Sequence, residues 1–131
     1  MSQTVFPTLR FNDARASIAW LEKVLGAEAL EVHEDDEGRV AHAEVQIGSS
    51  AIMCGDRPDS TATPAGTSVI YVVVDDADAA HARAREAGAT PTEITEQDYG
   101  SRDFSLIDAD GNHWAIGTYR GAGAKTSDGD R

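Results

Sequence analysis

His42 and Glu44 could carry proton-transfer chemistry, because they lie two residues apart in a segment that alternates apolar and polar residues. Residues two apart on a strand share a face, with their side chains about 7 Å apart. Burial would raise the pKa of the glutamate, as a general acid or base requires. The alternative is that both groups orient a bound ligand or lie on a solvated face.

The four histidines of the chain, His33, His42, His81 and His113, raise the question of a metal site. Histidine and glutamate are zinc ligands, and a site formed by His42, Glu44 and His113 is conceivable if the three face one hollow. His81 falls at the edge of a small-residue stripe on a predicted helix, and His33 lies beside an acidic turn. We therefore expect the histidines to line a pocket or face solvent, with the metal site as the alternative.

Arg10 and Arg102 could bind an anionic group of a ligand, because a guanidinium matches the geometry of a carboxylate or phosphate. The alternative is a surface ion pair, for which the chain offers 23 aspartates and glutamates against 11 lysines and arginines. Tyr99 precedes a glycine where a loop enters a predicted strand, and its ring could cover the mouth of a pocket. Cys54, the single cysteine, ends an apolar strand and is expected to be a buried small residue.

Hydrophobic periodicity predicts the elements that position these residues. In the first half, Asn12 and Asp13 are good N-cap residues for a helix, and Gly26 is a typical C-terminal stop. Pro7 has no N–H group, so the first strand should lie at an edge or dispense with that donor at its start. The pattern predicts a helix at 14–25 and strands at 3–11, 29–33, 39–47 and 51–54.

The second half repeats this order. Asp75 and Asp76 precede a predicted helix that Gly88 ends. Residues 56–66 are rich in proline, glycine and small polar residues and are predicted to be a linker. Residues 121–131 have almost nothing to bury and are predicted to be a disordered tail. The elements expected between them are a helix at 77–87 and strands at 68–74, 91–95, 101–107 and 112–119.

The spacing of the capping and turn residues indicates a duplication. Asp13 and Asp76 are 63 residues apart, as are Gly48 and Gly111 in the last hairpin of each half, and the two helix stops are 62 apart. The sequence therefore predicts an α+β fold of two tandem βαβββ modules, at 1–55 and 67–120, whose strands form a curved mixed β-sheet around a central cavity. Such a hollow, lined by alternating side chains, is a typical small-molecule site.

Three segments carry a likeness to a known family: FNDA at 11–14 with the helix that follows, VDDADA at 74–79, and DYGSRDFSLIDADGNHW at 98–114. With these segments the chain resembles the vicinal oxygen chelate superfamily, which includes glyoxalase I, extradiol dioxygenases and the fosfomycin- and bleomycin-resistance proteins. The last segment is similar to the glyoxalase-like, bleomycin-resistance-like branch. Because this superfamily hosts many chemistries, the likeness implies the fold more strongly than the activity.

The resemblance also implies where a divalent metal would bind. In the enzymes of the superfamily, His, Gln or Glu ligands lie on the first and last strands of each module. The corresponding positions here are Phe6, Val69, Ala115 and either Ile52 or Met53, and none of these side chains binds the usual divalent metals. Glyoxalase and dioxygenase chemistry in this fold depends on the metal as a Lewis acid, so we expect no metal site and no cofactor.

The resemblance, together with apolar residues at the metal-ligand positions, implies that the protein binds or sequesters a small molecule without a metal. Members of the family commonly form homodimers, so we also expect a homodimer. The first alternative is a metal-dependent lyase, isomerase or dioxygenase of the glyoxalase type. The second is a protein-interaction or regulatory module in which side chains fill the hollow. The residues expected to bind the ligand are Phe6, Thr8, Arg10, His42, Glu44, Met53, Val69, Tyr99, Arg102 and Ala115.

Composition limits the other possible partners. A net charge of −12 repels nucleic-acid phosphates and anionic lipid, so neither nucleic acid nor a membrane is an expected partner. No segment approaches the roughly 20 apolar residues that span a bilayer, and the first residues do not resemble a signal peptide. A lone cysteine suits a reducing compartment, so we expect a cytoplasmic protein.

Overall fold

The computed structural model describes residues 3, 5–58, 68–98 and 100–120. The first half forms β1 (Thr8–Phe11), α1 (Ala14–Leu25), β2 (Glu28–Glu34), β3 (Val40–Ile47) and β4 (Ser50–Asp56). The second half forms β5 (Val69–Val73), α2 (Ala77–Glu86), β6 (Thr95–Glu96), β7 (Arg102–Ile107) and β8 (His113–Gly117). The predicted tail, most of the predicted linker and Tyr99 lie outside the described residues.

Both helices begin at the predicted capping residues. The Asp13 side chain accepts a hydrogen bond from the Ala16 N–H at 3.1 Å, and the Asp76 side chain accepts one from the Ala79 N–H at 3.0 Å. Each bond satisfies an N–H group of the first helical turn that has no partner within the helix. Gly26 ends α1 in the left-handed conformation, with a φ of 69°, which glycine adopts without steric cost.

Two strands are shorter than predicted. β1 starts only at Thr8, because Pro7 has no N–H; before it, the side-chain amide of Gln3 makes both hydrogen bonds to the backbone of Ala51. The strand expected at 91–95 is reduced to Thr95–Glu96. There the Thr92 hydroxyl accepts the Ser105 N–H at 2.9 Å, so a side chain replaces a backbone partner and interrupts the regular ladder.

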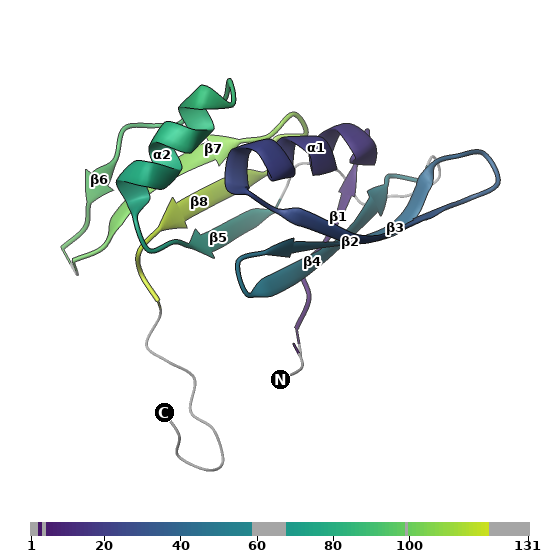
Figure 1. Ribbon diagram of the computed structural model, residues 1–131, viewed down its shortest axis with the longest axis horizontal. Coiled ribbons are helices and arrows are strands. Elements are labelled where there is room, and N and C mark those ends of the chain that lie inside the picture. The colour runs from purple at the N-terminus through teal and green to yellow at the C-terminus, as the bar shows by residue number, and fades with distance from the viewer. Residues whose placement is uncertain (1–2, 4, 59–67, 99, 121–131) are drawn as a thin grey trace, which may run out of the picture.

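The strands form two four-stranded mixed sheets with the same order, β1-β4-β3-β2 and β5-β8-β7-β6. In each sheet the first strand of the module runs parallel to the last one, and the remaining pairs are antiparallel. The shared order confirms the α+β fold of two tandem βαβββ modules. Figure 1 shows the modules side by side, with α2 over the strands of the second sheet and α1 beside those of the first.

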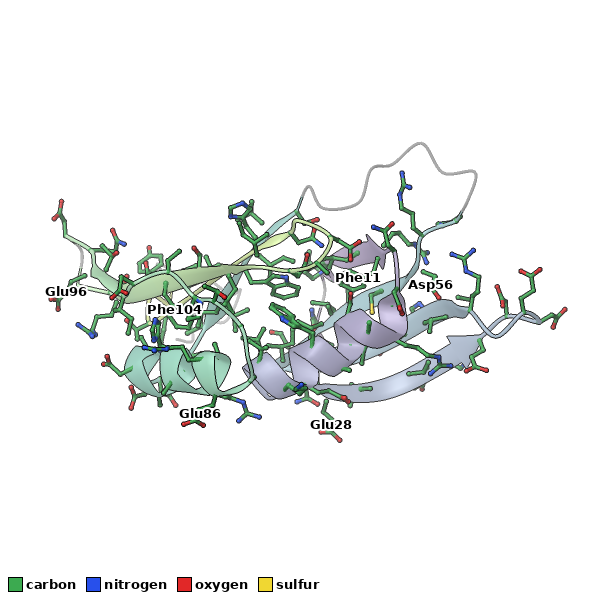
Figure 2. All side chains as sticks on the ribbon, turned by 90° about the horizontal axis from the view of Figure 1, so that it is seen from above. Phe11, Glu28, Asp56, Glu86, Glu96 and Phe104 are labelled. Atoms are coloured by element: carbon green, nitrogen blue, oxygen red, sulfur yellow. The ribbon has the colours of Figure 1, made fainter. Side chains whose placement is uncertain are left out.

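One hydrophobic core joins the helix-covered sides of both sheets. It includes Phe11 and Val45 of the first sheet and Phe104 and Ile116 of the second, all at most 4% exposed. Trp20 on α1 packs against Trp114 on β8, with ring centroids 6.3 Å apart. Figure 2 shows the two helices next to each other, with Phe104 on the sheet above α2. Because both sheets turn one side to this shared core, their other sides point away from it.

These outward sides are called the open faces below. Strand alternation and the pairing register assign their members. The first open face contains Thr8, Arg10, Glu31, His33, His42, Glu44, Met53 and Gly55. The second open face contains Val69, Tyr71, Val73, Asp103, Ser105, Ile107, His113, Ala115 and Gly117. None of the described helices is long and apolar enough to cross a membrane.

Candidate ligand-binding site

The first open face brings together five of the residues predicted to bind a ligand. Thr8 and Glu44 both pair with Met53, so these three lie in one row across β1, β4 and β3. Arg10 pairs with Gly55 in the next row. His42 lies two residues before Glu44 on β3, so the two side chains share this face. This face is polar and charged.

Two histidine–glutamate pairs occupy the β2–β3 part of this face. His33 Nε2 lies 2.8 Å from Glu31 Oε1, and His42 Nε2 lies 3.6 Å from Glu44 Oε2. The two imidazole rings stack with centroids 6.1 Å apart. The Glu44 side chain is 34% exposed, so it is not the buried carboxylate that the acid–base hypothesis needs. The geometry favours ligand orientation or solvation over proton transfer.

Arg10 is half-buried on the first open face. Its Nη1 donates a hydrogen bond to the Ala41 carbonyl oxygen at 3.2 Å. The guanidinium lies directly over Gly55, where a Cβ atom would collide with Nη1. Glycine at this position of β4 therefore creates the space that the arginine occupies.

The second open face is largely apolar and solvent-exposed. Val69 is 75% exposed, Ile107 is 62% exposed, and Tyr71 and Val73 are each 40% exposed. Exposed apolar side chains gathered on one surface are typical of a binding site. On this face only Val69 and Ala115 were predicted to bind a ligand. The alternation from Val69 through Tyr71 to Val73 is the sequence signal for the other exposed strand residues.

A polar cluster closes one end of the second open face. Asp103 accepts hydrogen bonds from the Tyr71 hydroxyl and from the Ser101 hydroxyl, both at 3.0 Å. The Tyr71 oxygen in turn accepts the Tyr119 N–H at 3.0 Å. The cluster covers Gly117 of β8, where a Cβ atom would lie 2.7 Å from Asp103 Cγ. In each module, therefore, a glycine of the last strand lies beneath a polar side chain.

A hollow of about 490 Å³ lies between the two modules. Its walls come from the segment before β1, from the β3–β4 turn and from β5. A small-molecule site typically has a volume of about 300–1,000 Å³, so the hollow is large enough for a ligand. Its lining residues include Val5, Pro7, Ile47, Ile52, Ile70 and Tyr71.

The remaining predicted residues lie elsewhere. Arg102 donates from Nη2 to Asp78 Oδ1 of α2 at 2.9 Å, so its side chain points toward the helix and away from the second open face. Phe6 is half-buried just before β1. Val69 and Ala115 lie on the second open face. The structure thus divides the predicted set between two faces of the molecule.

The positions at which the family would place metal ligands do not supply a suitable donor set. Phe6, Val69 and Ala115 have no ligand atom, and Met53 offers only a soft thioether. No three histidine, cysteine, aspartate or glutamate side chains gather into a possible metal site within the described parts of the chain. The conceivable site of His42, Glu44 and His113 is divided as well, because His113 lies on the second sheet.

Comparison with known proteins agrees with this architecture. An uncharacterized protein of Mycobacterium bovis is 31% identical over 121 residues, which cover 85% of this chain and 80% of that protein. TioX from Micromonospora sp. ML1 has a similar structure, with a TM-score of 0.74 and 22% identity over 89% of this chain and 98% of TioX. The antibiotic binding protein TnmS3 from Streptomyces sp. CB03234 has a TM-score of 0.73 and 18% identity, over 90% of this chain and 96% of TnmS3.

A family model matches residues 3–116, which include both βαβββ modules. The chain therefore belongs to the Glyoxalase/Bleomycin resistance protein/Dioxygenase superfamily.

Proposed function

We propose that this protein binds a small, mainly apolar and planar molecule without the help of a metal ion, and so acts as a binding or sequestration protein. The observation that carries the proposal is the second open face, where Val69 and Ile107 are 75% and 62% exposed. Leaving such side chains in water is unfavourable, and covering them releases about 25 cal/mol per Å² of apolar area. A relative of the same fold, TnmS3, is an antibiotic binding protein.

We further propose that the complete pocket forms in a homodimer. Both open faces point away from the shared core, so one chain leaves each of them uncovered. Among the described strands, each sheet has an unpaired edge at both ends, at β1 and β2 and at β5 and β6, and a second copy could cover such an edge. Placing the first open face of one copy against the second open face of another would enclose a ligand between a charged wall and an apolar wall.

The cellular location is also a proposal. Cys54 is the single cysteine and is buried in β4, where it packs as a small apolar residue. A chain that uses no disulfide is compatible with a reducing compartment. We therefore propose that the protein acts in the cytoplasm, and cell fractionation with an antibody to the native protein would test this.

Calorimetric titration with planar aromatic amides such as 2-naphthamide tests the proposed function. Ile107→Asp places a charge on the second open face and should weaken binding by about tenfold or more, because a desolvated charge is costly. The matched control is Leu30→Asp, an exposed apolar residue of β2 that should leave binding unchanged. Equal loss in both variants, or no binding by the unmodified protein, would contradict the proposal.

Two further measurements separate the alternatives. Light scattering coupled to gel filtration should give twice the monomer mass of 13.9 kDa. Elemental analysis should find no stoichiometric divalent metal, and EDTA should leave 2-naphthamide binding intact. A bound metal that is lost in His42→Ala would instead support a metal-dependent enzyme of the glyoxalase type.

A further inference from the structure

Arg10 is a half-buried arginine that lies on an open sheet face of this acidic chain. The net charge is −12, and Arg15, Arg102 and Arg120 each pair with a carboxylate, of Glu34, Asp78 and Asp75 respectively. By contrast, Arg10 forms no ion pair with any carboxylate in the described ranges, and its hydrogen bond is to the neutral carbonyl of Ala41. A half-buried guanidinium without a counter-charge favours an anion supplied from outside the chain.

The nearest carboxylates are held by the backbone. Asp56 accepts the Ala14 N–H at 2.8 Å through Oδ1 and the Val40 N–H at 2.7 Å through Oδ2. The Oδ1 atom of Asp35 accepts the Glu37 and Arg39 N–H groups at 2.9 and 3.0 Å. These bonds hold both carboxylates on the backbone, and neither forms an ion pair with the Arg10 guanidinium, although both line the hollow beside it.

There is room for an anion beside Arg10. A hollow of about 320 Å³ adjoins the guanidinium at the end of the first sheet. Its wall also includes Arg39, whose Nη2 donates to the Arg57 carbonyl oxygen at 2.7 Å, and the carboxylates Asp35 and Asp56. A guanidinium has five N–H donors in a planar fork that matches a carboxylate, and Arg10 uses Nη1 for Ala41.

Gly55 is the second independent feature. It belongs to the middle of a sheet, where glycine weakens the strand and commonly marks the close approach of another group. Here that group is the Arg10 guanidinium, since any side chain at position 55 would displace it. The glycine thus leaves the guanidinium the space above position 55, and the hollow adjoins it there.

We propose that Arg10, seated over Gly55, is a binding residue for a carboxylate group, so that the natural ligand is an anionic compound with an apolar body. The assignment of the apolar body rests on the proposed function, whereas the carboxylate subsite rests on Arg10, Gly55 and the adjoining hollow. Glu44 lies one row away on the same face, with its Oε2 3.6 Å from His42 Nε2.

A matched pair of ligands tests the proposal: 2-naphthoate, which carries a carboxylate, and 2-naphthamide, its neutral counterpart. We expect the unmodified protein to bind 2-naphthoate about tenfold more tightly, as is typical of a hydrogen bond to a charged group. Arg10→Gln should abolish this preference, and Arg10→Lys should retain part of it because the charge remains but the fork is lost. The control Arg15→Gln changes the net charge equally and should keep the full preference.

A second measurement examines the subsite without an apolar body. In ¹H–¹⁵N NMR spectra at constant ionic strength, replacing chloride by acetate should shift the Arg10 Nε–Hε signal more than that of Arg15. Equal affinity for the two naphthalene ligands, together with equal shifts at both arginines, would overturn the carboxylate subsite. Equal affinities alone leave the proposed function standing, whereas a selective acetate shift without naphthalene binding would support the subsite and refute the apolar site.

Discussion

Asp108 at the β7–β8 turn offers a direct test of how the fold holds its strands. Its carboxylate is only 8% exposed and accepts the Trp114 Nε1–H at 2.9 Å and the Asn112 Nδ2–H at 3.0 Å through Oδ2. Oδ1 accepts the Asn112 N–H at 2.9 Å. Trp114 and Asn112 are themselves 0% and 2% exposed, so water cannot replace the carboxylate.

Asp108→Asn replaces one acceptor oxygen by an amide that can only donate. If the amide takes the Oδ2 position, it faces two buried donors, and each unsatisfied donor costs about 1–3 kcal/mol. The expected loss in the free energy of unfolding is therefore about 2–5 kcal/mol, which lowers the melting temperature by roughly 10 °C in a chain of this size. Turning the amide would restore the acceptor for Trp114 but would set the NH₂ group against the backbone N–H groups of Asp110 and Asn112, so a cost remains.

Urea unfolding followed by far-ultraviolet circular dichroism measures the loss. The matched control is Asp36→Asn, in the exposed turn between β2 and β3, which should change stability by less than about 0.5 kcal/mol. In a Trp114→Phe background the cost of Asp108→Asn should fall by about 1 kcal/mol, because one of the stranded donors is gone. A stability of Asp108→Asn equal to that of the control would refute this account of the turn.

Three further outcomes are expected. Gly55→Ala should lower the melting temperature more than Gly117→Ala. A Cβ at position 55 would lie 2.8 Å from the backbone carbonyl oxygen of Ala41, whereas the atoms nearest a Cβ at position 117 belong to side chains that can move. Burial raises the pKa of Cys54 from 9.0 to about 11, so iodoacetamide at pH 8 should modify it about a hundredfold more slowly than in urea. Because the unfolded thiol ionises at a lower pH than the buried one, the free energy of unfolding should also fall as the pH rises from about 9 to 11. Urea unfolding at several pH values in that range measures this, and a constant free energy would contradict it.

Local sequence signals predicted most of the fold. The caps at Asp13 and Asp76 and the stop at Gly26 depend on hydrogen bonds and φ values within a few residues, so they can be predicted without knowing the tertiary structure. The 63-residue repeat predicted two tandem modules, and the identical strand order of the two sheets confirms them. Strand ends were harder to predict: side chains of Gln3 and Thr92 took over backbone pairing, which hydrophobic alternation does not detect.

The candidate site was predicted in part. Thr8, Arg10, His42 and Glu44, four of the residues predicted to bind a ligand, lie on one open face, because strand residues two apart share a face. Alternation does not tell which side of a strand a helix will cover, and Arg102 lies on the covered side with Asp78. Whether these residues bind a ligand remains the prediction that the binding experiments address.

By itself, the sequence determined the module, its duplication and the residue types at each strand position, because these follow from short-range caps, glycine stops and a period of two. Only the tertiary structure decided how the modules meet. The packing of Trp20 against Trp114 and the shared core turn both open faces outward. The β1–β4 pairing places Arg10 over Gly55, where it has no carboxylate partner within the described residues. Contacts between segments about 45 to 95 residues apart produce these features, and no local pattern encodes them.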